Sequence, residues 1–144
     1  MVAWKMKSKP ISAYQETLGM LHFARMLDKV RLNAAGNLDE TYCANLGSGF
    51  DGRCCDFLRV DYEDLVARVL VGGEDEEILR WCQEAGRPLD EGDLFVWNEF
   101  LKKVGWNDGV SETLARRKRE SGLDGRDEIQ TMLEYFEHDE GRRS

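Results

Sequence analysis

Several charged side chains, among them Arg25, Asp28, Lys29 and Arg31, lie within a stretch of sequence that is otherwise apolar on most sides. Arg25, Asp28 and Lys29 fall inside residues 14–32, a run of good helix formers without proline. A charge on the buried face of a helix must be paired, bound to a ligand or solvated in a cavity, because burying it alone costs too much free energy. These residues are therefore the first candidates for a functional site.

Two interpretations of these charges remain open. In the first, they form an internal network of ion pairs that ties the helix to the glycine-rich segment after it, with Asp51 or Glu63 as a partner. In the second, they line a polar pocket in which the two cations donate hydrogen bonds to a carboxylate or phosphate while the aspartate orients Arg25. Tyr42 would then close one wall of that pocket.

Three further residues could contribute to such a pocket. His22 lies one helical turn before Met26 and could act as an acid or base near neutral pH, although a lone helical histidine is more often a satisfied neighbour. Trp97, like Trp81, has core spacing on its helix, and Asn98 beside it would need a backbone group or a ligand as a partner if it points inward. The candidate ligand-binding residues are His22, Arg25, Asp28, Lys29, Tyr42, Trp97 and Asn98.

The cysteine pattern favours reduced thiols over disulfides or a metal site. The cysteines are Cys43, Cys54, Cys55 and Cys82. Two of them are adjacent, no C-x-x-C pair occurs, and the two histidines are far apart, so we expect no metal site and no cofactor. Arg53 and a helix start could lower the pKa of Cys54 or Cys55, but a buried inert thiol is the commoner state, and their reactivity stays open. The spacing also gives no Ser-His-acid triad.

Charge and hydropathy exclude two classes of partner. Twenty basic residues against twenty-eight acidic ones give a formal charge of −8, which repels a phosphate backbone, so we expect no nucleic-acid partner. The basic run at residues 116–119 is interpreted as a solvated helix face because acidic residues flank it. No window approaches the roughly 18 apolar residues of a membrane span, and no export signal is recognisable. We therefore expect a cytoplasmic protein without a membrane partner.

Helical periodicity predicts an all-α fold, a compact bundle of five to six helices with a long glycine-rich loop after the first helix. The length predicts a single domain over residues 1–144, with an ordered core at about 10–138 and short charged termini. The loop is placed at residues 36–53. The predicted helices cover residues 14–32, 62–70, 74–85, 90–103, 111–121 and 129–136. Asp124 and Asp127, three residues apart, resemble a shortened capping box before the last of them.

Four segments resemble, in order, the bacterial domain-of-unknown-function family 5069. They are residues 21–31 (LHFARMLDKVR), 56–61 (DFLRVD), 95–98 (FVWN) and 132–142 (MLEYFEHDEGR). The resemblance covers about residues 10–142 and implies a stand-alone bacterial domain, but it implies no substrate and no reaction. Its motif segments contain Arg25, Asp28, Lys29, Trp97 and Asn98, and the range that it covers includes Tyr42.

Three hypotheses about function follow, and whether the protein is an enzyme stays open. The leading one is a non-catalytic module that binds a small anion or a partner segment through the cationic residues of the first helix. The alternative is an enzyme in which His22 or Asp28 carries a proton and Arg25 stabilises developing charge. The third is a structural or assembly homodimer that forms through the tryptophan-bearing helices.

Overall fold

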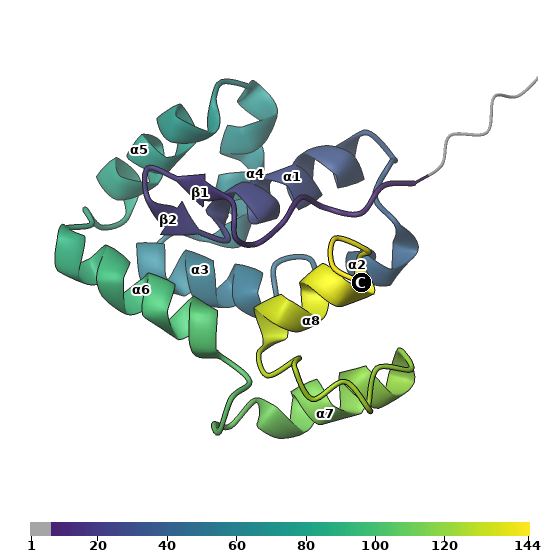
Figure 1. The fold of residues 1–144 in the computed structure, drawn as a ribbon. Helices are drawn as coiled ribbons and strands as arrows, with labels where there is room; N and C mark the ends of the chain where they lie inside the picture. Colours follow the sequence, from purple (N-terminus) through teal and green to yellow (C-terminus); the bar gives the residue numbers. More distant parts are fainter. Residues whose placement is uncertain (1–6) are drawn as a thin grey trace, which may run out of the picture. The chain divides into compact units, whose positions relative to one another are not determined.

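A computed structural model describes residues 7–144 and contains eight helices and one two-stranded antiparallel sheet in that range (Figure 1). The fold is therefore mostly helical, as predicted. Contacts divide the chain into two compact units, residues up to Leu94 and Phe95–Ser144. None of the helices described between residues 7 and 144 has both the length and the apolar character of a membrane span.

The first predicted helix is wrong in its N-terminal half, where the chain forms a hairpin. Strand β1 (Glu16–Thr17) pairs with β2 (Met20–Leu21), and the two residues between them, Leu18 and Gly19, have φ values of 49° and 82°. Positive φ at both turn residues is the signature of a type I′ hairpin turn, and Gly19 adopts it without a steric penalty. The apolar residues read as helical periodicity thus belong to a strand pair.

Helix α1 (Phe23–Ala34) follows directly and is the central element of the first unit. It contacts β1, α4 (Tyr62–Val71) and α5 (Asp75–Ala85), and most of its side chains are buried (Figure 1). The extended segment before the hairpin also packs along this unit, because the Ser8 amide donates to the Asn37 carbonyl at 2.6 Å. The prediction of a buried first helix holds for residues 23–30, whereas residues 31–34 are half-buried or exposed.

The segment predicted as a long glycine-rich loop contains two helices. Helix α2 (Glu40–Cys43) is capped by Asp39, whose carboxylate accepts from the Thr41 amide at 3.0 Å, and α3 (Phe50–Leu58) begins before the glycine-rich stretch ends. The count is therefore eight helices in residues 7–144, not five to six. Glycines and asparagines suggested a loop, but Asp39 is a good N-cap and the buried face of α3 supplies tertiary contacts that override low helix propensity.

Helices α4 and α5 match their predicted ranges of 62–70 and 74–85 closely. Gly86 ends α5, and a Cβ atom on this residue would lie 1.9 Å from the Leu58 carbonyl oxygen. The next amide, that of Arg87, donates to the same carbonyl at 3.1 Å. Only glycine permits this close approach between the ends of α3 and α5.

The second unit contains most of α6 (Glu91–Lys103), together with α7 (Ser111–Glu120) and α8 (Met132–Asp139). The first two match their predicted ranges, but α8 begins three residues later than the predicted 129–136. The Thr131 hydroxyl caps α8 by accepting from the Glu134 amide at 3.2 Å, so Thr131 and Glu134 define the start rather than Asp124 and Asp127. Leu101, Ile129 and Leu133 form the buried centre of this unit.

Candidate functional site

A buried carboxylate, that of Asp51 in the first turn of α3, accepts hydrogen bonds from three sides. The His22 Nε2 atom lies 2.9 Å from Oδ1, and the Lys29 ammonium lies 2.7 Å from Oδ2. The Gly47 amide donates to Oδ2 at a longer 3.4 Å. His22 and Lys29 are seven residues apart at the start and middle of α1, so they project on the same side of it. Asp51 therefore connects α1 to α3.

The protonation states in this cluster follow from its burial. Burial lowers the pKa of His22, and the hydrogen bond and charge of Asp51 only partly oppose this, so the ring is neutral at pH 7. Burial raises the pKa of Asp51, but the hydrogen bond from His22 and the charge of Lys29 outweigh it and hold that pKa below its usual range. Asp51 and Lys29 thus form an ion pair of zero net charge beside a neutral histidine.

One atom of this cluster lacks a partner. If Nε2 of the neutral His22 ring carries the proton that it donates to Asp51, Nδ1 is an acceptor. This Nδ1 atom is buried and has no hydrogen-bond partner among residues 7–144. The His22 side chain as a whole is 1% exposed, and its backbone has a φ of 72° at the N-cap of α1.

Two other charged residues of α1 hold the segment before the hairpin. The Arg25 guanidinium donates to the Ile11 carbonyl at 3.2 Å, and the Asp28 carboxylate accepts from the Ile11 amide at 2.9 Å. The Arg25 guanidinium also lies 5.8 Å from the centre of the Tyr42 ring, within the range of a cation–π contact. Both charges thus bind the backbone of one residue, and Arg25 is 3% exposed.

The structure brings five of the seven sequence-predicted residues into the first unit around α1. His22 and Lys29 meet at Asp51, and Arg25 and Asp28 meet at Ile11 with Tyr42 beside Arg25. The remaining two lie in the second unit. Trp97 is buried with its ring 6.1 Å from that of Phe100, and Asn98 is half-buried. Of the two partners suggested for the network, Asp51 is the one that binds, whereas Glu63 is exposed on α4.

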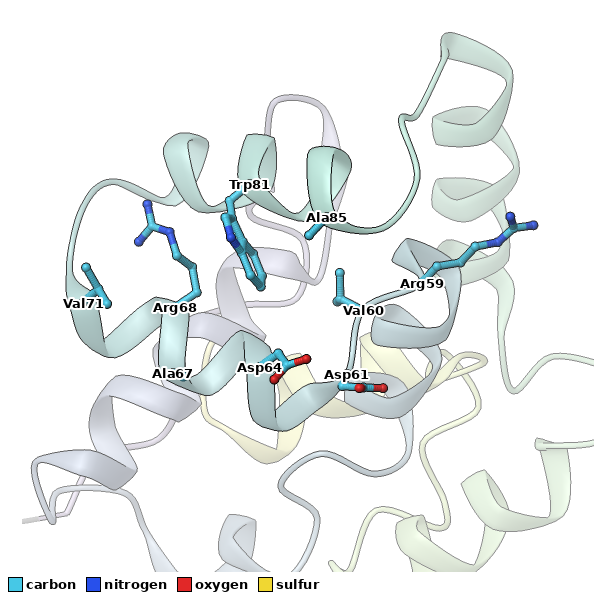
Figure 2. A pocket seen from close by; sticks show the side chains of 9 residues that line it. All are labelled: Arg59, Val60, Asp61, Asp64, Ala67, Arg68, Val71, Trp81 and Ala85. Carbon is cyan, nitrogen blue, oxygen red and sulfur yellow. The ribbon is translucent and has the colours of Figure 1, made fainter.

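An open groove of about 510 Å³ lies between α4 and α5, within the first unit (Figure 2). We call it the α4–α5 groove. It is lined by Arg59, Val60, Asp61, Asp64, Ala67, Arg68, Val71, Trp81 and Ala85. Figure 2 shows the Trp81 ring directed from α5 toward α4 with the Arg68 side chain beside it, whereas Arg59 extends away from the others. The sequence-predicted site residues do not line this groove.

The sequence contained a signal for this groove. Asp61, Asp64, Arg68 and Val71 are spaced at i, i+3, i+7 and i+10, which places them along one side of α4. Trp81 and Ala85 are four residues apart on α5. Sequence reasoning assigned Trp81 to the core, but the structure leaves it half-buried, because the facing side of α4 carries charged rather than large apolar residues.

A second open groove, of about 420 Å³, lies along α7 in the second unit. Its lining residues are Glu112, Thr113, Ala115, Arg116 and Arg119. Two cations of this basic run have internal partners, since Arg116 lies 3.0 Å from Glu120 and Lys118 donates to the carbonyls of Arg126 and Ile129. This pattern agrees with a helix face that satisfies its own charges.

The buried thiols are poor nucleophiles. Burial raises the pKa of Cys55 and that of Cys82 to about 12, and it raises the pKa of Cys54 well above its ordinary value. All four cysteines are free, and Cys43 is exposed. Residues 7–144 bring together no group of three or more His, Cys, Asp or Glu side chains that could hold a metal ion.

Comparison with known proteins gives a family and no activity. No curated protein matches the chain. Residues 7–142, nearly the whole length of the chain, match a protein family described as a domain of unknown function (DUF5069). The match includes the hairpin, α1 with its buried charges, both helices of the α4–α5 groove and the second unit up to Arg142. The chain therefore belongs to the DUF5069 family.

Proposed function

We propose that the protein is a non-catalytic binding module whose ligand carries a carboxylate next to an apolar group, as a small molecule or as a segment of a partner protein. The ligand binds in the α4–α5 groove. One observation carries this proposal: a stripe of opposite charges on α4 faces a half-buried indole at an open surface. The volume of the groove lies in the range of about 300–1,000 Å³ that is typical of small-molecule sites.

The charged residues of α1 are less suited to hold an external anion. Lys29 contacts the Asp51 carboxylate at 2.7 Å, and Arg25 donates to the Ile11 carbonyl while lying beside Tyr42. An incoming anion would compete with these contacts and would need a path to side chains that are almost fully buried. These contacts support an internal network around α1 and favour a ligand site elsewhere in the first unit.

The groove has groups for each part of such a ligand. Arg68 donates one N–H group to the Gly72 carbonyl at 2.8 Å, which fixes the guanidinium at the end of α4. Its fork of donors suits a carboxylate, and the Trp81 ring beside it offers a flat apolar surface. Asp61 and Asp64 at the other end of the stripe would attract an amino group on the same ligand. The lining residues include no histidine, cysteine or serine, which favours binding over catalysis.

A thermal-shift screen of small carboxylates tests this proposal. A ligand that binds only the folded state raises the melting temperature by mass action, so at least one aromatic or aliphatic amino acid or carboxylate should stabilise the wild type. Arg68→Gln, which keeps a donor for the Gly72 carbonyl, should lose that stabilisation. Arg116→Gln, in the groove along α7, should keep it. Equal responses of the two variants to every ligand would contradict binding in the α4–α5 groove.

A second candidate function is general acid–base catalysis at His22. The observation that favours it is the pairing of the His22 ring with Asp51 together with the partnerless Nδ1 atom, an arrangement in which a carboxylate orients a base. In this scheme His22 carries the proton and Arg25 stabilises charge. It requires the ring to become accessible, and amide hydrogen exchange with ring NMR tests this. A ring signal that stays neutral and insensitive to added solutes at all pH values from 5 to 8 would exclude it.

The free thiols also support the expectation of a reducing compartment such as the cytoplasm. All four cysteines are unpaired, and three are packed in the interior of the first unit. Structural disulfides are typical of oxidising compartments and rare in the cytosol.

A further inference from the structure

Helix α6 carries both buried and exposed apolar side chains. Trp97 and Leu101 are four residues apart and are buried. Phe95 and Val96 are 67% and 63% exposed, and Phe100, four residues after Val96, is also exposed. Neighbouring exposed apolar residues on one helix are typical of an interaction surface rather than of a solvated face.

The charges on α6 are arranged with opposite signs at its two ends. Glu91 and Asp93 lie in the first turn, and Lys102 and Lys103 lie in the last. Asp93, Val96, Phe100 and Lys103 are spaced at i, i+3, i+7 and i+10, so they form one stripe about 15 Å long. We call this set the α6 stripe.

The α6 stripe is complementary to a reversed copy of itself. The midpoint between Asp93 and Lys103 is position 98, which is also the midpoint between Val96 and Phe100. An antiparallel second helix centred there would place Val96 against the partner's Phe100 and Asp93 against the partner's Lys103. A two-fold interface has this property, since residue i contacts residue j and residue j contacts residue i.

We infer that α6 is the contact between two copies of this chain, packed antiparallel about a two-fold axis near Asn98. The inference goes beyond the proposed ligand site, which it does not require. The charged residues of the stripe can exchange or share their present partners. Lys103 lies 3.3 Å from Glu99 in an exposed pair, and such pairs contribute little stability. Asp93 contacts Arg87, and its two oxygens can accept further donors.

Sedimentation equilibrium of the full chain tests this inference over concentrations from micromolar to millimolar. The wild type should move from the mass of one chain to that of two as the concentration rises. Lys103→Glu and Asp93→Lys should each raise the dissociation constant at least about tenfold, because each sets like charges against one another. An equimolar mixture of these two variants should dimerise again, since the mixed pair restores opposite charges at both ends.

The apolar part of the contact has its own variant and control. Val96→Glu removes an exposed valine that makes no ion pair and should raise the dissociation constant by a similar factor, even if Asp93→Lys fails to fold. Leu70→Glu changes a side chain of comparable exposure, 56%, on α4 and should leave the dissociation constant unchanged. A wild type that stays a single chain at every concentration, a mixture that stays monomeric, or equal effects of Val96→Glu and Leu70→Glu would overturn the inference.

Discussion

Asp51 is the residue on which the charges inside the first unit depend. Its carboxylate neutralises the Lys29 ammonium, accepts from His22 and is almost fully buried. Removing one partner of a buried ion pair costs more than the pair contributes, because the remaining charge is left without compensation. The cluster therefore supports the fold first, whatever else it does.

We predict that Asp51→Asn lowers the free energy of unfolding by about 3–5 kcal/mol, because it leaves Lys29 as a buried charge with no counter-charge from Asp51. Urea denaturation with matched m-values measures the change. Glu120→Gln is the control, since Glu120 pairs with Arg116 at an exposed site and should change stability by less than about 1 kcal/mol. Equal urea midpoints for the two variants would contradict a stabilising role for the Asp51 cluster.

The same cluster predicts how stability depends on pH. The pKa of His22 is lowered in the folded state below its ordinary value of 6.5, so the unfolded chain binds a proton more readily. The stability associated with His22 is then fully present above pH 6.5 and is lost as the pH falls toward the folded-state pKa. The charges nearest the ring are Asp51, Lys29 and Arg25, and the last two keep opposing its protonation in this window.

We predict that the wild type loses unfolding free energy between pH 7.5 and 5.5 and that His22→Gln loses less, because its amide cannot take up a proton. The slope for one such group is at most about 1.4 kcal/mol per pH unit. Urea denaturation at the two pH values gives the comparison. A wild type and a variant with the same pH dependence would show that His22 is not the group responsible.

The thiols provide a prediction from burial alone. Cys43 is exposed, whereas the other three cysteines are buried and have raised pKa values. A disulfide reagent such as Ellman's reagent should label a single thiol quickly in the native protein and the rest only after denaturation. Cys43→Ser should abolish the fast phase. A fast phase that survives this substitution would mean that the interior of the first unit opens readily.

Among the elements, the helices with clear amphipathic periodicity were predictable and the turns were not. The ranges of α4, α5 and α6 follow from apolar spacing and from their flanking glycines. The hairpin was missed because Leu18 is an unusual residue at positive φ, so the turn carried only one glycine as a signal. The short helices α2 and α3 were missed because glycine and asparagine are typical of loops.

The candidate site, like the fold, could be predicted only in part from the sequence. Sequence spacing identified the charges on α1 and named Asp51 as a possible partner, because burial of a charge demands compensation. It did not predict that Arg25 and Asp28 both bind the Ile11 backbone, since that contact depends on where the hairpin sends the chain. The α4–α5 groove could not be predicted from the sequence, because it depends on which sides of α4 and α5 face each other. The periodicity of a single helix does not show how two helices pack.

The start of α8 gives a prediction at this scale. Thr131→Ala should lower the free energy of unfolding by about 1 kcal/mol, because it removes the hydroxyl that accepts from the Glu134 amide. Asp124→Ala, at the position that the sequence suggested as the cap, should have a smaller effect since Asp124 is exposed outside the helix. Thermal or urea denaturation compares them. A larger cost for Asp124→Ala would place the functional cap at the earlier position.

Within the whole molecule, we assign different roles to the two compact units. The first unit uses its buried charges for internal connections and leaves the α4–α5 groove open. The second unit begins within α6, where the α6 stripe offers a surface for another copy of the chain. Membership in the DUF5069 family gives this arrangement no assigned activity, so the ligand must be found by experiment.

Ligand binding in the α4–α5 groove is tested most directly by titrating isotope-labelled protein with benzoate, a carboxylate on an aromatic ring, and following the titration by NMR. We expect the Trp81 indole N–H signal and the backbone signals of Asp64 and Arg68 to shift together and saturate, and we expect Arg68→Gln to remove the effect. Shifts confined to residues around Arg25 and Tyr42 would contradict the claim and return the ligand site to the charges of α1.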